Sequence, residues 1–204
     1  MKTGVRTWGV SIVVYLSTVV ACGSAQGIDR SGTIDRDGLN FSAGGTFCSS
    51  ISSSGRGYFT SVGMGYGIAA HVDLVLRIYN GDMTFPGEPR WPLSVRSAFA
   101  GGGIELSYFP GRQSVWSPYI SCGVDLITAA DSNDAANFGC RGYGLHASLG
   151  IEYALSEAFG AAGAFSFWNL RFSDLVGTAP DNAQLIGPIR SDFVSFSFVL
   201  RYYP

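Results

Sequence analysis

The chain has 204 residues, enough for one domain but too few for two that each bury a substantial core. Charged residues make up 14% of it and hydrophobic residues 47%, so a soluble domain of this composition would lack polar groups to cover its surface, whereas a lipid-facing surface needs few. The formal net charge of −2 provides no basic footprint and argues against nucleic acid as a partner.

The first 25 residues have the organisation of a signal peptide. A positively charged start is followed by an apolar run over 8–20 and by small residues that suit cleavage before Gln26. We therefore expect residues 1–25 to direct export from the cytoplasm. In an alternative interpretation, the same region is a lipoprotein signal, and Cys22 becomes the lipidated first residue.

After the signal peptide, residues 26–38 form a polar segment too short to fold alone, and 39–204 are expected to be one domain. No stretch of about 18 apolar residues follows, so the sequence predicts no transmembrane helix there. An exported, weakly charged chain of this kind is either a secreted β-sandwich or an outer-membrane β-barrel.

The mature sequence is dominated by alternation of apolar and polar residues, which is the period of a β-strand. The pattern is clearest over 194–202, where bulky apolar residues occupy one face and serines and an arginine dominate the other. In chain order, about eight strands are predicted, near 39–48, 58–66, 72–79, 104–108, 120–126, 145–153, 159–170 and 194–202.

The connections between these strands alternate between short and long. Short ones are expected near 67–71, 110–117 and 154–158, and long polar ones near 49–56, 80–94, 130–140 and 171–190. Short turns at one end and long loops at the other are typical of outer-membrane barrels. An even number of strands then places both termini at the periplasmic end. Apolar residues in the two longest loops either pack over the barrel mouth or bind a partner.

Four tyrosines recur at the ends of alternate strands, always on the apolar face. Amphipathic aromatic residues at a common depth are typical of a bilayer interface, and a β-sandwich would have to bury all of them. The predicted membrane-interface aromatics are Tyr66, Tyr108, Tyr153 and Tyr202.

On these patterns the chain resembles the OmpA/OmpX-type small outer-membrane β-barrel superfamily. The resemblance covers 39–204 and rests on the stretches 118–124 and 150–157 and on the aromatic last strand. That strand resembles the signal read by the barrel-assembly machinery, although the chain ends in Pro204 rather than in an aromatic residue.

The resemblance implies an all-β fold, an eight-stranded antiparallel up-and-down transmembrane β-barrel with short periplasmic turns and longer extracellular loops. It also implies the bacterial outer membrane as the location. We expect a monomer whose partners are outer-membrane lipid, the barrel-assembly machinery and an extracellular ligand. We expect no cofactor, because no zinc-binding spacing, EF-hand loop or phosphate-binding glycine motif is present.

If the bulky face points to lipid, seven ionisable side chains fall on the inner face. An eight-stranded barrel is just wide enough for side chains to fill it, and buried charges must be paired. We therefore predict a polar, side-chain-filled interior and a structural or surface-interaction role; a narrow pore for small solutes is the alternative. The predicted interior network consists of Asp73, Arg77, Glu105, Asp125, His146, Glu152 and Arg201.

His146 and Ser148, with Glu152 or Glu157 nearby, have the residue types of an activated nucleophile. Outer-membrane lipid A deacylases are also eight-stranded barrels and use a His-x-Ser pair with a glutamate. An enzyme that cuts lipid should present this pair to the membrane, yet both residues fall on the predicted inner face. We therefore predict no enzymatic activity, with a lipid A-modifying enzyme as an alternative.

The cysteines allow one disulfide in an oxidising compartment. Cys48 and Cys140 are both predicted near the outer loops, where they could pair, whereas Cys122 is predicted in mid-strand facing lipid. The pairing is left open.

Overall fold

The computed structural model describes residue 34 and residues 36–51, 55–69, 71–84, 96–110, 115–131, 138–177 and 189–204. The predicted signal peptide and most of the segment 26–38 lie outside these residues. The described chain forms eight strands: β1 (Gly38–Ser50), β2 (Arg56–Ala69), β3 (Val72–Thr84), β4 (Arg96–Tyr108), β5 (Trp116–Asp131), β6 (Phe138–Ala154), β7 (Phe159–Gly177) and β8 (Ile189–Tyr202).

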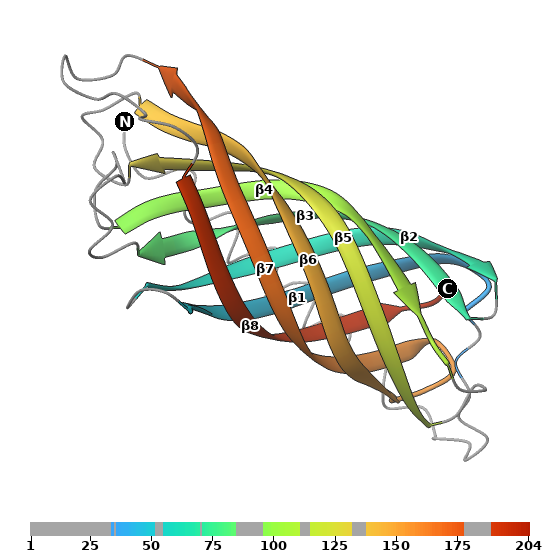
Figure 1. Ribbon diagram of the computed structural model, residues 1–204. Coiled ribbons are helices and arrows are strands. Elements are labelled where there is room, and N and C mark those ends of the chain that lie inside the picture. Colours follow the sequence, from blue (N-terminus) through green and yellow to red (C-terminus); the bar gives the residue numbers. More distant parts are fainter. Residues whose placement is uncertain are drawn as a thin grey trace, which may run out of the picture.

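Each strand pairs antiparallel with its neighbour in the sequence, and β1 also pairs with β8, which closes the sheet into a barrel (Figure 1). The predicted eight-stranded antiparallel barrel is thereby confirmed, and the secreted β-sandwich, which would need two separate sheets, is wrong. Among the described residues, no helix is long and apolar enough to cross a membrane.

The barrel has two different ends. At the turn end lie the connections after β2, β4 and β6, together with the start of β1 and the end of β8 (Figure 1). At the loop end lie the connections after β1, β3, β5 and β7, of which 85–95 and 178–188 are the longest. The alternation of short and long connections holds broadly, although the connection between β4 and β5 is longer than the one between β1 and β2.

The predicted loop 171–190 is too long, because β7 continues to Gly177. A register shift between Arg141 and Gly142 lets β6 and β7 stay paired as far as Phe138 and Gly177. The sequence prediction ended early because polar residues such as Asp174 replace apolar ones there. Near the loop end this replacement marks the edge of the apolar surface and not the end of the strand.

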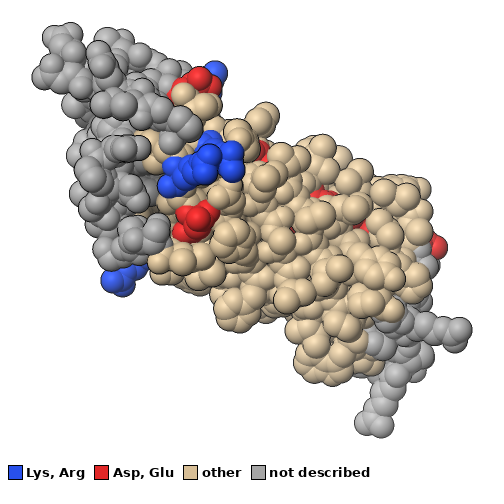
Figure 2. All heavy atoms as spheres, in the orientation of Figure 1, with Lys and Arg blue, Asp and Glu red and all other residues tan. Residues whose placement is uncertain are grey.

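Side chains alternate between the outer surface and the interior along every strand, as the pleat of a strand requires. The outward positions carry most of the exposed large hydrophobic residues, for example Leu76, Ile104, Leu149 and Phe196. On the face shown in Figure 2, uncharged residues cover most of the middle of the barrel, with a few acidic atoms visible between them, and all visible Lys and Arg atoms lie near the loop end. This apolar surface is suited to lipid and unsuited to water.

The chain that precedes β1 closes the turn end from inside. Ile34 is buried against Ala154 and Tyr203, and Arg36 is buried beside the backbone of Gly67. A Cβ atom on residue 67 would overlap the carbonyl oxygen of Arg36, so this close approach requires glycine. The last part of the segment 26–38 therefore belongs to the barrel interior.

We predict that Leu76→Arg destabilises the barrel in lipid. Leu76 lies near the middle of β3 on the outer face, 55% exposed, between Met64 and Ile104. An arginine at the bilayer midplane of a barrel costs about 2–4 kcal/mol of unfolding free energy. The measurement is urea unfolding of the protein in phosphatidylcholine vesicles.

The matched control is Ala130→Arg, an outward position at the loop end of β5 that is paired with Ala98 and Gly139, where the cost should fall below about 1 kcal/mol. Equal costs for the two variants would contradict the placement of the apolar belt.

Candidate functional site

The interior contains two clusters of ionisable side chains, of which the loop-side cluster is Arg77, Glu105, Asp125 and His146. Nδ1 of His146 lies 2.7 Å from Oδ2 of Asp125, and Nε2 lies 3.0 Å from Oε2 of Glu105. The same Glu105 oxygen accepts a contact from Nη1 of Arg77 at 3.0 Å. The imidazole is thus held between two carboxylates, one of which also pairs with an arginine.

The backbone of β5 makes room for this imidazole. His146 is paired across the β5–β6 ladder with Gly123, and a Cβ atom there would overlap the ring. On its other side the ring stacks on Trp168, with centroids 4.5 Å apart. These neighbours fix His146 as a buried bridge between the two carboxylates, 5% exposed.

The turn-side cluster is Arg36, Glu152, Arg201 and Tyr203. Oε2 of Glu152 lies 3.1 Å from Nη2 of Arg36 and 3.4 Å from Nη1 of Arg201, and Oε1 accepts a hydrogen bond from the Tyr203 hydroxyl at 2.9 Å. The Arg36 guanidinium also lies 4.1 Å from the centroid of the Phe109 ring, a cation–π distance. Glu152 is fully enclosed, so its charge depends on these partners.

A small polar cavity of about 30 Å³ separates the two clusters. Arg77 and Glu105 line it on one side and Arg201 on the other. A water molecule needs roughly 10–15 Å³ measured in this way, so the cavity has room for about two waters and no larger solute. Its remaining wall is rich in hydroxyl groups, from Ser42, Ser61, Ser121, Ser148, Ser166 and Ser197.

The loop end of the interior is apolar, contrary to the prediction of a polar filling throughout. Rings from β2, β3 and β7 meet there, with the Phe59 centroid 5.2 Å from Tyr79 and 5.8 Å from Trp168. Every strand contributes to this apolar plug, which consists of Cys48, Phe59, Tyr79, Met83, Phe99, Ile127, Ala129, Cys140, Trp168, Leu170, Phe172, Ile189 and Phe193.

The alternation of each strand places these aromatic residues on the inner face, although this face was predicted to be polar. Phe172, predicted to lie in a loop, is fully buried in the plug. The plug stabilises the folded barrel, because each large aromatic side chain contributes roughly 2–3 kcal/mol to the free energy of unfolding when it is removed from water.

The structure places all seven predicted interior residues inside the barrel, six of them in the two clusters. The seventh, Asp73, is buried near Arg201 and Arg36, and neither of its oxygens has a hydrogen-bond partner among the described residues. Arg36 and Tyr203 were missed. Both continue the inner-face parity of β1 and β8, so extending the alternation by three residues before the predicted strand 39–48 and by one after 194–202 would have found them.

His146 and Ser148 do not form a nucleophile with its base. The hydroxyl of Ser148 donates a hydrogen bond to Ser166 at 2.8 Å, while both ring nitrogens of His146 face carboxylates. Glu152 belongs to the turn-side cluster, and Glu157 is exposed in the turn after β6. The residue types of a triad are present, but the contacts that activate a serine are not made among these residues.

Cys48, Cys122 and Cys140 are free thiols. Cys48 and Cys140 are both buried in the apolar plug, but β7 and β8 separate their strands around the barrel, so the disulfide left open by the sequence is not formed. Cys122 is exposed on the outer face of β5. Among the described residues, no group of three or more His, Cys, Asp or Glu side chains could hold a metal ion.

The four predicted interface tyrosines are all exposed on the outer surface near the turn end. Two aromatic residues that the sequence analysis did not include extend this ring. Trp116 lies 4.5 Å from the Tyr153 ring, and Phe159 lies 4.8 Å from the Tyr202 ring. Aromatic side chains therefore surround the turn end at the edge of the apolar surface.

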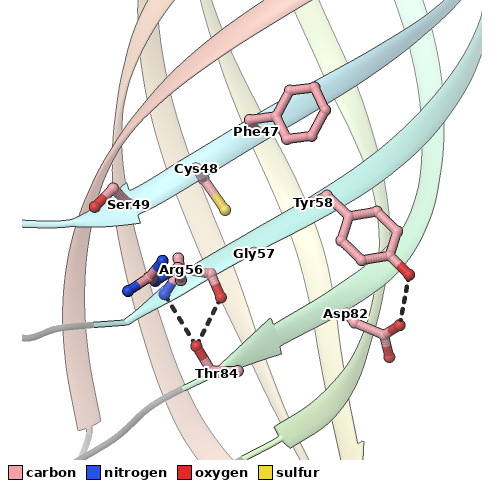
Figure 3. A pocket seen from close by; sticks show the side chains of 8 residues that line it. All are labelled: Phe47, Cys48, Ser49, Arg56, Gly57, Tyr58, Asp82 and Thr84. Carbon is pink, nitrogen blue, oxygen red and sulfur yellow. Dashed lines mark hydrogen bonds between the residues drawn. The ribbon is translucent and has the colours of Figure 1, made fainter.

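An open surface pocket of about 700 Å³ lies outside the barrel at the loop end of β1–β3 (Figure 3). Its polar groups already satisfy one another: the Tyr58 hydroxyl bonds to Asp82 at 3.0 Å, and the Thr84 hydroxyl bonds to the backbone of Arg56. These contacts tie the Tyr58, Asp82 and Thr84 side chains to other residues of the pocket wall.

A closed barrel of eight strands, apolar outside and filled by side chains inside, is the fold of the OmpA/OmpX type of small transmembrane β-barrels. No protein-family model and no curated protein matches the sequence. Several solved structures are similar to it in fold. The chain is similar to Neisserial surface protein A, with 17% identity over 81% of this chain and 96% of that one and a TM-score of 0.56.

It is also similar to the outer membrane protein OprG from Pseudomonas aeruginosa, with 14% identity, 84% of this chain and 99% of that one covered, and a TM-score of 0.49. A third similar structure is that of the outer membrane enzyme PagL, with 10% identity, 80% and 99% coverage, and a TM-score of 0.44. At such low identity the likeness shows the fold alone.

We predict that Glu152→Gln lowers the free energy of unfolding by about 3 kcal/mol, because removing one charge of a buried ion cluster leaves its partners uncompensated. Arg36 and Arg201 would lose their shared counter-charge. Urea unfolding in vesicles measures the change. The control is Glu157→Gln, which removes the same charge at an exposed turn position and should alter stability by less than about 0.5 kcal/mol. A neutral result for Glu152→Gln would contradict the cluster.

Proposed function

We propose that this protein is a non-conducting, non-enzymatic β-barrel of the bacterial outer membrane. In this role it is a structural anchor that presents the segments at its loop end to an extracellular partner. The observation that carries the proposal is the apolar plug, to which all eight strands contribute.

The plug argues against the narrow-pore alternative. A path for ions or small polar solutes needs polar groups along its whole length, and this cross-section of the interior is lined by aromatic and aliphatic side chains. Further along the axis, the two ion clusters fill the interior, and Ile34 and Arg36 close the turn end. Conduction would require several of these packed groups to move together.

The contacts of His146 and Ser148 argue against the enzyme alternative. His146 and Ser148 face the interior, and their hydrogen bonds run to Asp125, Glu105 and Ser166. A lipid-cleaving site needs a nucleophile that substrate reaches from the bilayer.

The outer surface supports the membrane location. Its apolar middle suits the hydrocarbon layer of a bilayer, and the aromatic side chains around its turn end suit the interface between lipid and water. The last strand carries Phe196, Phe198 and Tyr202 on this surface, in keeping with recognition by the barrel-assembly machinery.

Reconstituted into planar bilayers, the folded protein is expected to show no ion conductance above that of the lipid. Folding is checked by the heat-dependent shift of its gel mobility, which also tests the barrel in the membrane fraction. Discrete, reproducible channel openings from protein that passes this check would contradict the proposal.

The variant Ser148→Ala tests the enzyme alternative. Expressed in cells, the wild-type protein and this variant are expected to give the same lipid A profile by mass spectrometry, because the Ser148 hydroxyl donates its hydrogen bond to Ser166 and not to a catalytic base. A lipid A species that appears with the wild type and disappears with the folded variant would establish the enzyme instead.

A further inference from the structure

Three arginines gather on the outer surface at the loop end of β6, β7 and β8. Arg171 of β7 is paired directly with Arg190 of β8 in the antiparallel ladder. Arg141 lies on β6 one row nearer the loop end, where it is paired with the exposed Asp174 of β7. Figure 2 shows a basic patch near the loop end of this face, beside acidic groups and above the mostly uncharged middle of the barrel.

The pairing of Arg171 with Arg190 is unfavourable as it stands. Directly opposed residues in an antiparallel ladder have Cβ atoms about 5 Å apart, and like charges there repel. Among the described residues, no carboxylate lies within ion-pair distance of either guanidinium. The nearest outward acid on β8, Asp192, instead accepts a hydrogen bond from Asn169 at 2.6 Å.

Neighbouring side chains also orient the Arg171 guanidinium. Its Nε donates to Oδ1 of Asn169 at 3.2 Å, and its Nη1 donates to the Tyr143 hydroxyl at 3.5 Å. Arg171 is half-buried among these groups, whereas Arg190 is exposed. One guanidinium is therefore held in place and the other is free to close on a ligand, which favours an anion shared by both.

The patch lies at the height of lipid headgroups. Phe165, Phe167, Val194 and Phe196 form the apolar surface below it, and the Asn169–Asp192 pair marks its edge. With about 3.3 Å per residue and a strand tilt near 40°, Arg171 lies roughly 10 Å beyond Phe167 along the barrel axis. Outward arginines just beyond a hydrocarbon layer reach the phosphate groups of the lipids.

Other sectors of the loop end differ. The outward positions of β3 and β5 there are Asp82, Thr84, Thr128 and Ala130. The arginines at the loop ends of β2 and β4, Arg56 and Arg96, are separated by β3 and are not paired with each other. The directly opposed pair of arginines therefore distinguishes β7 and β8 from these strands.

We propose that Arg171 and Arg190 bind the phosphate group of a lipid in the leaflet at the loop end of the barrel. The proposal rests on the membrane location proposed above. A phosphate accepts hydrogen bonds from two guanidinium groups at once and removes their mutual repulsion, which a neutral headgroup does not do.

The test uses the full chain refolded in dodecyl maltoside, which contains no phosphate. Lipid A carrying two phosphates, and the same lipid with its phosphates removed, are titrated, and bound lipid is counted by native mass spectrometry. We expect retention of the phosphorylated lipid by the wild type, a loss of affinity of about tenfold or more in R171Q/R190Q, and little retention of the dephosphorylated lipid.

The matched control is R56Q, which removes an arginine from another sector of the same end and should change affinity less than about twofold. Thermal unfolding supplies a second measurement, in which the two conditions should differ in direction. Without phosphorylated lipid, R190Q should match or exceed the wild type in melting temperature, because the repulsion between Arg171 and Arg190 is relieved. Addition of that lipid should raise the melting temperature of the wild type more than that of R190Q.

Equal retention by the wild type and R171Q/R190Q, or equal retention of both lipids, overturns the proposal. So does stabilisation by inorganic phosphate alone that equals that of the lipid, because the pair would then be a free-anion site. If R171Q/R190Q does not fold, R171K/R190K replaces it. This variant keeps the positive charges but loses the planar guanidinium groups that can donate two parallel hydrogen bonds, and it should retain the lipid more weakly than the wild type. A wild type that forms no heat-modifiable barrel would instead refute the membrane location.

Discussion

The hydrogen-bonded pairing of β1 with β8 is the interaction on which the rest of the structure depends. It joins the first strand to the last, in a register that runs from Phe41 and Tyr202 to Ser50 and Phe193. Without it, two strand edges would expose unpaired backbone N–H and C=O groups to hydrocarbon, at a cost of several kcal/mol for each group. Closure also creates the interior, so the plug and the ion clusters exist only once β8 meets β1.

The interior in turn constrains the register of the strands. Glu152 on β6 pairs with Arg201 on β8 and with Arg36 ahead of β1, and His146 on β6 bridges carboxylates on β4 and β5. A slip of any strand by one residue would turn its inner side chains toward lipid. Buried charges that lose their partners in this way are strongly unfavourable, so the clusters oppose alternative registers at the same time as they fill the barrel.

The outer surface divides into zones that follow the bilayer. Aromatic rings surround the turn end, apolar side chains cover the middle, and polar and charged side chains begin near the loop end. Within that last zone the arginines of β6–β8 break the symmetry, because Arg171 and Arg190 face each other without an acidic partner among the described residues. A filled interior and an asymmetric rim together make the outer surface and the loop end, rather than the lumen, the parts of this barrel suited to interactions.

The sequence by itself determined the strands, their approximate number and which face of each points outward. These features are local: a strand repeats every two residues, so the alternation over 194–202 or 145–153 states its own orientation. For the same reason the inner positions of Asp73, Arg77 and Glu152 followed from parity alone. The tertiary structure alone decided which inner groups meet. Arg36 reaches Glu152 across 116 residues of chain, the rings of Phe59 and Trp168 meet across the lumen, and Cys48 and Cys140 stay unpaired. Such contacts depend on the shear and closure of the whole barrel, which set the height of each strand against those opposite it, and no pattern along one strand contains that information.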